Sequence, residues 1–277
     1  MCGIFGLVGK IKKPNQALNL ISKTQKYRGP DKTGFYKDKK NKVLIGTNRL
    51  SIIDEKKGDQ PIQSEDNNYI ITFNGVIYNF KKLKKFLISK NFRFKTDCDT
   101  EVVLKSYMHW GSKCFNYFDG MWAVAIYDKQ KKIIILSRDY VGQTPLYYSI
   151  DKKKFIYSSS LVSILKTKLV KKEINRNAVH DFFTFATINA PKTLFKDIFQ
   201  VSPGENIIFS LKKNQIKKNF YWQIEKGPNY NKFFKHELSI KNIFFNNFKN
   251  FTIADSKPYL FLSRGIDSNL IREILSN

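Results

Sequence analysis

Histidine and cysteine are scarce in this 277-residue chain, which contains three of each. Neither residue type occurs at the paired spacings of protein metal sites, so the sequence predicts no metal centre. The odd number of cysteines fits a reducing compartment, where an isolated thiol either fills a core or is reactive. The three are Cys2, Cys98 and Cys114.

Long apolar runs are absent as well. No stretch of the chain approaches the roughly 20 apolar residues that a helix needs to span a bilayer. No basic segment precedes the short apolar run at the N-terminus, as it would in a secretory signal. We therefore predict a cytoplasmic protein that does not bind membranes.

Acidic residues are few, with 23 Asp and Glu against 49 Lys and Arg, which gives a formal net charge of +26. Such a balance first suggests a nucleic-acid partner. The lysines, however, are spread along the chain in segments such as KDKKNK, KKLKK and SLKKNQIKK, where turns or exposed helix faces are expected. No helix carries a dense basic stripe interleaved with aromatic residues. The sequence therefore favours a solvated lysine-rich surface over nucleic-acid binding.

The hydrophobic content of 42% is enough to fill a substantial core. Short apolar runs between Gly, Pro and Asn predict strands at 3–9, 42–53, 68–79, 121–128, 132–139, 145–150, 154–160 and 205–211. Apolar residues at helical spacing predict helices at 14–27, 80–91, 99–111 and 174–187. Many short strands with helices at intervals indicate an α+β protein, in which antiparallel sheets are covered by helices.

The composition changes near the C-terminus. Residues 223–234 contain Gly, Pro and Asn without periodicity and are expected to form a linker. The segment 235–277 then predicts an amphipathic helix at 236–250, a short buried strand at 259–262, and a second helix after a turn. A strand with buried faces needs neighbouring strands, and none follows. We therefore expect this segment to be the truncated start of a second domain.

A cysteine directly follows the initiator methionine. Removal of Met1 would leave Cys2 with a free α-amine, which titrates near pH 7.7–8.0 and could serve as the general base for its own thiol. On its own, a cysteine at this position is more often an inert buried thiol. The function of Cys2 therefore depends on the segments that accompany it.

Those segments occur in a characteristic order. CGIFG is followed by YRGPD, NRLSIID, FNGVIYN, TDCDTEV, FDGMWAVAIYD and SRDYVGQTPLYY. This set resembles the glutaminase domain of class II glutamine amidotransferases, whose nucleophile is an N-terminal cysteine, and within them the asparagine synthetase branch. The segment 191–222 is similar to the end of that domain, and LFLSRGIDSNL is similar to the ATP-pyrophosphatase loop that begins the synthetase domain.

The resemblance implies a fold and an activity. Residues 2–222 would form an N-terminal-nucleophile αββα sandwich, in which helices flank two antiparallel sheets, and residues 235–277 would begin an α/β ATP-pyrophosphatase domain. The first domain would hydrolyse glutamine to glutamate and ammonia without a cofactor. Amidation of aspartate with that ammonia would require ATP and Mg²⁺ and the synthetase half, which is incomplete in this chain.

The resemblance also assigns roles to individual residues. Cys2 would form the thioester, and Asn74 with the backbone N–H of Gly75 would form the oxyanion hole. Arg49 would bind the α-carboxylate of glutamine, and Asp99 its α-ammonium. Taken singly, each has an ordinary alternative: Arg49 in a surface ion pair, Asn74–Gly75 in a hairpin turn, and Asp99 as a helix cap.

Two positions depart from the family pattern. Val76 stands where the family has an acidic residue that contacts the α-ammonium of glutamine, which predicts weakened glutamine binding. Arg264 stands where the nucleotide loop has its first glycine, and a side chain there makes a phosphate cradle doubtful. The residues of that loop assigned to ATP are Leu262, Ser263, Gly265, Asp267 and Ser268.

Several interpretations remain open from the sequence. The chain is either a truncated synthetase or one half of a split enzyme whose synthetase is a separate polypeptide. It could instead serve an amidotransferase that aminates another acceptor, such as a sugar or a cell-surface precursor. A third interpretation is a weakly active or silent scaffold or regulatory subunit that keeps the glutaminase fold. A homodimer is compatible with each.

Overall fold

The computed structural model describes residues 1–151, 154–224, 242, 244 and 259–276. The chain divides into two compact units, Met1–Gln223 and Ile224–Asn277. The first unit contains two six-stranded sheets, and the described residues of the second include a helix near its C-terminal end.

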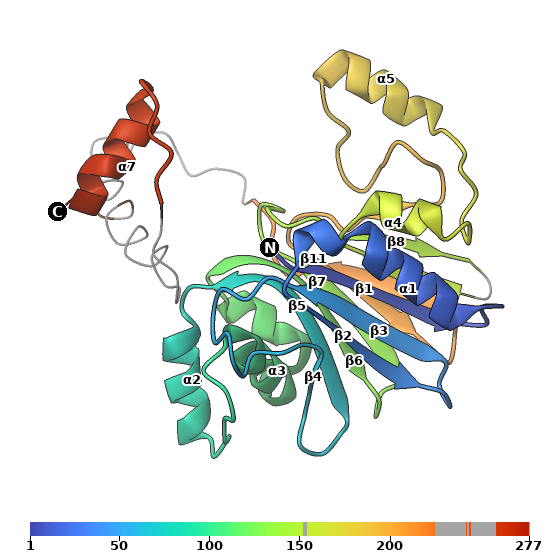
Figure 1. Cartoon of the computed structure of the whole chain (residues 1–277), viewed down its shortest axis with the longest axis horizontal. Helices are drawn as coiled ribbons and strands as arrows, with labels where there is room; N and C mark the ends of the chain where they lie inside the picture. Colours follow the sequence, from blue (N-terminus) through green and yellow to red (C-terminus); the bar gives the residue numbers. More distant parts are fainter. Residues whose placement is uncertain (152–153, 225–241, 243, 245–258, 277) are drawn as a thin grey trace. The chain divides into compact units, whose positions relative to one another are not determined.

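The first sheet places the N-terminal strand in its interior (Figure 1). Its order is β10 (Phe199–Gln200), β8 (Tyr147–Ile150), β9 (Lys154–Ser158), β1 (Gly3–Gly9), β3 (Val43–Arg49) and β2 (Lys32–Asp38), with every pair antiparallel. Both neighbours of β1 therefore hold it through backbone hydrogen bonds. Cys2, which directly precedes β1, starts from a fixed backbone position.

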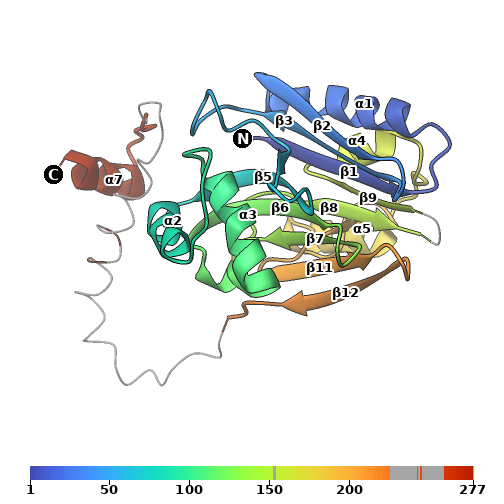
Figure 2. The same cartoon turned by 90° about the horizontal axis from the view of Figure 1, so that it is seen from below.

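The second sheet carries the segment that contains Asn74 and Gly75. Its order is β12 (Gln215–Phe220), β11 (Glu205–Ser210), β7 (Ile133–Arg138), β6 (Gly120–Asp128), β5 (Tyr69–Ile77) and β4 (Ile62–Gln63), again all antiparallel. The two sheets face each other in Figure 2. The prediction of two antiparallel sheets is confirmed.

The main core lies between the sheets, where alternate residues of each strand point inward. Ile4, Val8 and Ile45 from the first sheet pack with Ala125 and Leu136 from the second. The rings of Phe155 and Phe209 stack at a centroid distance of 4.4 Å and join the two sheets directly. Burial of these apolar side chains is the main force that holds the layers together.

Helices cover the outer faces of the sandwich. Helices α1 (Pro14–Thr24) and α4 (Leu161–Lys166) pack side by side on the first sheet, where Leu18, Ile21 and Ile164 meet Phe5 and Ile156. Helices α2 (Phe80–Ser89) and α3 (Asp99–Trp110) lie together, with α3 packed on the second sheet (Figure 2). Short 3₁₀ turns, η1 (Lys26–Arg28) and η2 (Gly111–Tyr117), follow α1 and α3, and α5 (Arg176–Phe185) follows α4.

The eight strands and four helices predicted within residues 2–222 all occur. The sequence did not predict β2, β12, the short strands β4 and β10, or the short helix α4. Strands β2 and β12 are edge strands whose residues are exposed or half-buried along their whole length. They carry many polar and charged side chains, so they lack the alternation of apolar residues that marks a strand in a sequence.

The buried strand expected at 259–262 is wrong. These residues form no strand, and the side chains of Tyr259 and Phe261 are 92% and 96% exposed. No strand is available for pairing among the described residues of the second unit, and a strand without a neighbour has unpaired backbone groups. The helix predicted after the turn is α7 (Ile266–Ser276). The predicted helix at 236–250 and most of the predicted linker at 223–234 lie outside the described residues.

In the part of the chain that the structure describes, no helix is both long and apolar enough to cross a bilayer. The same residues contain no group of three or more His, Cys, Asp and Glu side chains that could hold a metal ion.

Candidate active site

The five residues assigned to glutamine come together in one pocket of the first unit. Cys2 precedes β1, Arg49 ends β3, Asn74 and Gly75 lie in β5, and Asp99 begins α3. All five line a pocket of about 530 Å³ that is partly open to solvent. The fold thus gathers residues from four elements that are far apart in the sequence.

The Cys2 thiol lies at the start of a fixed strand. Its Sγ donates a long hydrogen bond of 3.7 Å to the carbonyl oxygen of Leu50. Burial raises the pKa of the Cys2 thiol, so this group needs a base to become a thiolate. At the chain terminus burial lowers the pKa of the Met1 amine and the charge of Arg28 lowers it further, whereas the charges of Cys2 and Asp31 act in the opposite direction.

The Asn74 side chain is buried without a partner. It has no solvent exposure, and neither its Nδ2 nor its Oδ1 forms a hydrogen bond in the structure. A buried amide without partners costs free energy, and almost all buried polar groups in proteins are paired. Asn74 lines the same pocket as Cys2. Its amide is therefore available to a ligand in the pocket.

Gly75 lies within β5, opposite Trp122 of β6. A Cβ atom at this position would lie 2.0 Å from the carbonyl oxygen of Met121 and 2.7 Å from the Cα of Trp122. The close approach of β6 therefore requires a glycine here. The alternative assignment of Asn74–Gly75 to a hairpin turn is wrong, because both residues lie inside a nine-residue strand.

Asp99 is a buried carboxylate in the wall of the pocket. Its side chain is 4% exposed, and its Oδ2 accepts a hydrogen bond of 3.0 Å from the backbone N–H of Ile77. Burial raises the pKa of Asp99 to about 6, although backbone hydrogen bonds and the charge of Arg49 act in the opposite direction. Asp99 is the first residue of α3, but its bond to Ile77 ties it to β5 as well. Asp99 therefore joins α3 to β5 and lines the pocket, in addition to its place at the start of the helix.

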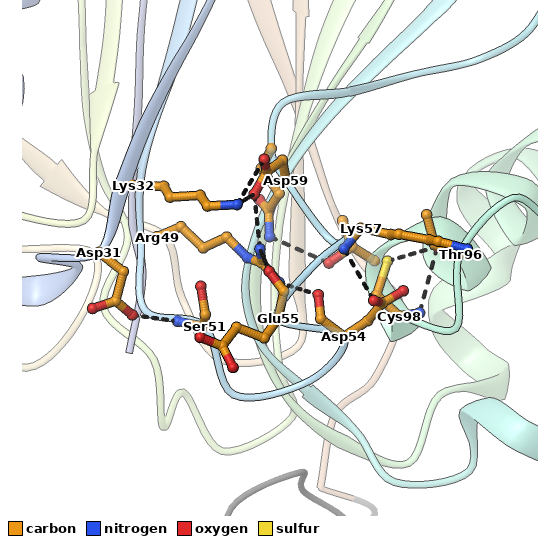
Figure 3. Close-up of polar contacts among 12 residues, drawn as sticks. Asp31, Lys32, Arg49, Ser51, Asp54, Glu55, Lys57, Asp59, Thr96 and Cys98 are labelled. Atoms are coloured by element: carbon orange, nitrogen blue, oxygen red, sulfur yellow. Dashed lines mark hydrogen bonds and ion pairs between the residues drawn. The ribbon is translucent and has the colours of Figure 1, made fainter.

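Arg49 binds the loop at residues 50–59 (Figure 3). Its Nη1 donates to the Glu55 carbonyl at 3.1 Å and to Asp59 Oδ1 at 2.9 Å. Its Nη2 donates to the carbonyls of Ile53 at 3.0 Å and Asp54 at 2.7 Å. The alternative of an ion pair is met in part, because Arg49 pairs with the exposed Asp59, but the guanidinium itself is 4% exposed and also holds three carbonyls of the loop. Its contact with a glutamine carboxylate stays a prediction.

Gln60 is a pocket residue that the sequence analysis missed. Its Oε1 accepts a hydrogen bond of 2.7 Å from the N–H of Phe73, and its Nε2 donates to Thr100 Oγ1 at 3.2 Å. Phe73 precedes Asn74, and Thr100 follows Asp99. The buried side chain of Gln60 thus connects β5, which carries Asn74, to α3, which begins with Asp99. No local pattern in the sequence distinguishes this glutamine from one in an exposed loop.

The loop that precedes β2 is fastened beside Cys2. Asp31 Oδ2 accepts from the N–H of Ser51 at 2.8 Å, as Figure 3 shows, and the Asp31 N–H donates to the Arg49 carbonyl at 3.2 Å. Arg28 Nε donates to the Cys2 carbonyl at 3.4 Å. A Cβ on Gly29 would lie 2.1 Å from the Asn48 carbonyl oxygen. These contacts fix the backbone on two sides of the pocket.

The residues assigned to ATP form a turn closed by its own hydroxyl groups. The N–H of Ser263 donates to Ser268 Oγ at 3.1 Å, and the N–H of Gly265 donates to Ser263 Oγ at 3.1 Å. Ser268 Oγ in turn donates to the carbonyls of Ser263 and Gly265. Leu262 is 53% exposed, and Asp267 lies in the first turn of α7. The N–H groups of Ser263 and Gly265 thus bond within the turn, and the assignment of this loop to ATP stays a prediction.

Comparison with known families identifies the first unit. The family described as "Glutamine amidotransferase domain" matches residues 1–222. This chain belongs to that family. The glutamine amidotransferase domain therefore covers both sheets and every residue of the pocket.

The chain also resembles longer proteins. It is 35% identical to a Methanocaldococcus jannaschii protein provisionally named asparagine synthetase 2 (glutamine-hydrolyzing), over 98% of this chain and 56% of that protein. It is 28% identical to asparagine synthetase 3 (glutamine-hydrolyzing) of Bacillus subtilis, over 99% of this chain and 45% of that protein. The chain thus spans about half the length of these relatives.

A solved structure has the same fold as the amidotransferase domain. The glutamine phosphoribosylpyrophosphate amidotransferase of B. subtilis matches 80% of this chain and 50% of its own chain, with a TM-score of 0.61 and 18% sequence identity. This likeness confirms the predicted N-terminal-nucleophile sandwich.

A Gln60→Leu substitution tests the connection across the pocket of the amidotransferase domain. Loss of both hydrogen bonds leaves the Phe73 N–H and Thr100 hydroxyl unpaired and loosens Asn74 and Asp99, so kcat/KM for glutamine should fall at least tenfold. The rate at which iodoacetamide alkylates Cys2 should not change, because no contact of Gln60 reaches the thiol. The exposed Gln63→Leu is the matched control, and equal effects of the two substitutions would contradict a positioning role.

Proposed function

We propose that this amidotransferase domain hydrolyses glutamine to glutamate and ammonia, with Cys2 as the nucleophile. The observation that carries the proposal is the unpartnered, fully buried amide of Asn74 in the same pocket as Cys2 and Asp99. The buried amide of Asn206 is unpaired as well, so what distinguishes Asn74 is its place in the lining of the pocket that contains Cys2 and Asp99. An amide donor beside a thiol is the arrangement required for acyl transfer.

The thiol attacks first. After removal of Met1, the α-amine of Cys2 accepts the proton of its own thiol, and Sγ forms a bond to the side-chain amide carbon of glutamine. The carbonyl oxygen becomes an oxyanion that Asn74 Nδ2 and the Gly75 N–H stabilise. The carbon–nitrogen bond then breaks, the α-ammonium returns its proton to the leaving nitrogen, and ammonia departs. Water adds to the resulting thioester, and its collapse releases glutamate and restores the thiol.

Two charged residues orient the substrate in this proposal. Asp99 receives the α-ammonium of glutamine, because a buried carboxylate is stabilised by a cation that enters the pocket. Arg49 receives the α-carboxylate. Since Arg49 already binds the carbonyls of residues 53–55, the glutamine carboxylate would share this guanidinium with the loop or displace part of it. Glutamine binding is thus coupled to the conformation of residues 50–59.

The direct test measures products. The purified chain is incubated with glutamine, glutamate and ammonia are quantified, and Cys2→Ala serves as the control. Equal release of both products that disappears in Cys2→Ala supports the proposal. Absence of release from a chain whose intact mass shows the loss of Met1 would favour the scaffold interpretation instead.

The acceptor of ammonia is a separate part of the proposal. The names of the longer relatives support aspartate as the acceptor, in a reaction that uses ATP and Mg²⁺ on a synthetase region. In the turn at 263–268 the N–H groups of Ser263 and Gly265 bond to serine hydroxyls of the same turn, so we assign no ATP step to these residues. The synthetase could be a separate polypeptide in the cytoplasm, and the chain could form a homodimer. Another acceptor is the alternative to aspartate. Asparagine formation on adding aspartate, ATP and Mg²⁺ to a cell extract with this chain would separate them.

A Val76→Glu substitution should strengthen glutamine binding. Val76 lines the pocket next to Ile77, whose N–H binds Asp99, so a carboxylate here would add a second acceptor for the α-ammonium. A charge-assisted hydrogen bond contributes about 1.5–3 kcal/mol, which corresponds to a decrease in KM of about tenfold or more. Steady-state kinetics would measure KM. The control is Val76→Gln, whose side chain has the size of glutamate but carries no charge. An unchanged KM in Val76→Glu would contradict this explanation.

A further inference from the structure

The outer face of the first sheet gathers lysines that are scattered in the sequence. Helices α1 and α4 lie side by side on this face (Figure 1). Three grooves follow one another along it, and each pair of neighbours shares lining residues. We call the lysines of these grooves together the lysine surface.

The first groove lies between the end of β1, the start of α1 and the turn that joins β2 to β3. It offers about 1320 Å³ of open space. Its exposed cations are Lys10, Lys12, Lys37, Lys39 and Lys42. Ile11, Pro14 and Leu44 provide apolar lining between them.

One carboxylate, that of Asp38, lines the first groove. Its oxygens accept hydrogen bonds from the backbone N–H and Nδ2 of Asn41 and from the hydroxyl of Tyr127, at 2.8–3.0 Å. Asp38 therefore remains a single negative charge, and it forms no ion pair with the five lysines of the groove. Five positive charges stand against this one carboxylate.

The second groove runs between α1 and the segment after α4, and it shares Ile11 and Lys12 with the first. Its further cations are Lys13, Lys23, Lys166 and Lys168. Leu20 and Leu169 line it between these cations. No carboxylate lines this groove.

The third groove shares Lys166 and Lys168 with the second and adds Lys171 and Lys172. Its remaining lining is apolar, from Val162, Leu165, Val170 and Phe195. Val162 is 52% exposed, which leaves an aliphatic side chain open to solvent between charged ones. Each groove therefore combines apolar side chains with a border of ammonium groups.

These lysines form no ion pairs in the described chain, although the charge of Lys171 lies close enough to Glu173 to lower the pKa of that carboxyl. Like charges at such density repel one another, and an acidic ligand would relieve that repulsion. This chain is a poor source of the ligand. A second copy carries +26, and residues 224–277 contain eight Lys and Arg against five Asp and Glu.

We propose that the lysine surface binds an acidic, amphipathic segment of another protein. Such a segment would place aliphatic side chains in the grooves and its carboxylates against the lysines, as amphipathic helices do in apolar grooves. A nucleic acid fits less well, because its bases stack on aromatic and arginine side chains. The three grooves contain one aromatic side chain, Phe195, and no arginine. A bilayer also fits less well, because membrane binding uses protruding apolar side chains rather than grooves.

The test measures binding of the full chain to labelled synthetic probes by fluorescence anisotropy. The main probe is a peptide helix with leucine on one face and glutamate elsewhere. The comparison probes are the same peptide with serine in place of leucine, single-stranded polyuridylate, and vesicles that contain phosphatidylserine. We expect the glutamate–leucine helix to bind at least tenfold more tightly than the serine peptide and more tightly than the RNA or the vesicles.

Charge reversal locates the binding site. The pair Lys12→Glu with Lys168→Glu, at the two junctions between grooves, should weaken binding of the glutamate–leucine helix at least tenfold. The control pair, Lys81→Glu with Lys85→Glu, makes the same change in net charge on the exposed face of α2 and should weaken it less than threefold. Glutamine hydrolysis should be unchanged in both, which keeps this test separate from that of the pocket.

Each other outcome overturns the proposal. Tighter binding of RNA or vesicles would assign the lysine surface to that ligand. Equal loss in the two charge-reversed pairs, or equal binding of the leucine and serine peptides, would reduce it to non-specific attraction by net charge. No binding of the main probe at low ionic strength would show that the lysines are merely solvated.

Discussion

Asn74→Ala lowers kcat for glutamine hydrolysis about 100- to 1000-fold, the range for loss of one oxyanion-hole donor. The expected loss is in kcat, because the oxyanion forms only after the thiol attacks the amide carbon. In the substrate-free protein the Asn74 amide has no partner, so its removal breaks no hydrogen bond of the fold. Steady-state kinetics with glutamine should therefore show the loss while the melting temperature stays near that of the parent.

Asn206→Ala is the matched control for this substitution. Asn206 is also fully buried in the second sheet with both amide atoms unpartnered, but it lies in β11 and does not line the pocket. It should alter stability as Asn74→Ala does and leave kcat within about twofold. If both substitutions lowered kcat equally, the effect would come from the sheet, and Asn74 would lose its role as a donor to the oxyanion.

Asp99→Asn raises KM for glutamine about 10- to 100-fold. The substitution replaces a charged partner of the α-ammonium by a neutral amide, and such charge-assisted contacts are worth about 1.5–3 kcal/mol. The Asn side-chain oxygen can still accept the hydrogen bond from Ile77, so the local fold is kept. Asp128→Asn, a buried carboxylate at the far end of β6, is the control and should leave KM unchanged.

The pH dependence of KM provides a second measure of the same residue. Burial raises the pKa of Asp99 to about 6, and the proposed contact needs the ionised form. In the parent protein KM for glutamine should therefore rise as the pH falls below about 6. In Asp99→Asn this rise should be absent, and its persistence would assign the titration to another group.

The effect of Asp99→Asn on the free energy of unfolding is opposite to its effect on binding: the substitution weakens glutamine binding but stabilises the fold at neutral pH. A folded pKa of about 6 against an ordinary 3.8 means that the neutral carboxyl is favoured in the folded state. The associated stability is complete below pH 4 and is lost as the pH rises through 6, by about 3 kcal/mol for a shift of this size. The Asp99→Asn variant keeps this stability at all pH values, because its amide does not ionise. Urea unfolding should show a variant that gains on the parent between pH 4 and 7, although it binds glutamine less tightly.

The elements that the sequence predicted share strong local patterns. The strands with long apolar runs, such as β1 and β6, were found because their side chains are buried on both faces. Edge strands such as β12 lack this signal. Residues 259–262 have the apolar signal, but a strand also needs a neighbour to pair with, which no local pattern reports.

The site residues that could be predicted are those that stand in recognisable sequence motifs. Cys2, Asn74 and Asp99 were found from motifs, and the structure brings them to one pocket. Gln60 and the loop contacts of Arg49 were not, because both depend on backbone groups whose positions follow from the folded chain. The lysine surface escaped for the same reason. Its lysines come from the β1–α1 connection, α1, the β2–β3 region, and α4 with the segment that follows it, and they are neighbours only after the sheet has formed.

The interior position of β1 also orders events during biosynthesis. Met1 leaves the ribosome first, whereas β9, which closes one side of β1, is completed only when residues 154–158 have been added. At 5–20 residues per second this delay is roughly ten seconds or more. An aminopeptidase would therefore meet Met1 before β1 is held between β3 and β9. We expect that a protein refolded with Met1 in place would lose Met1 more slowly than the nascent chain does. Its glutaminase activity would then follow the fraction of chains that have lost Met1.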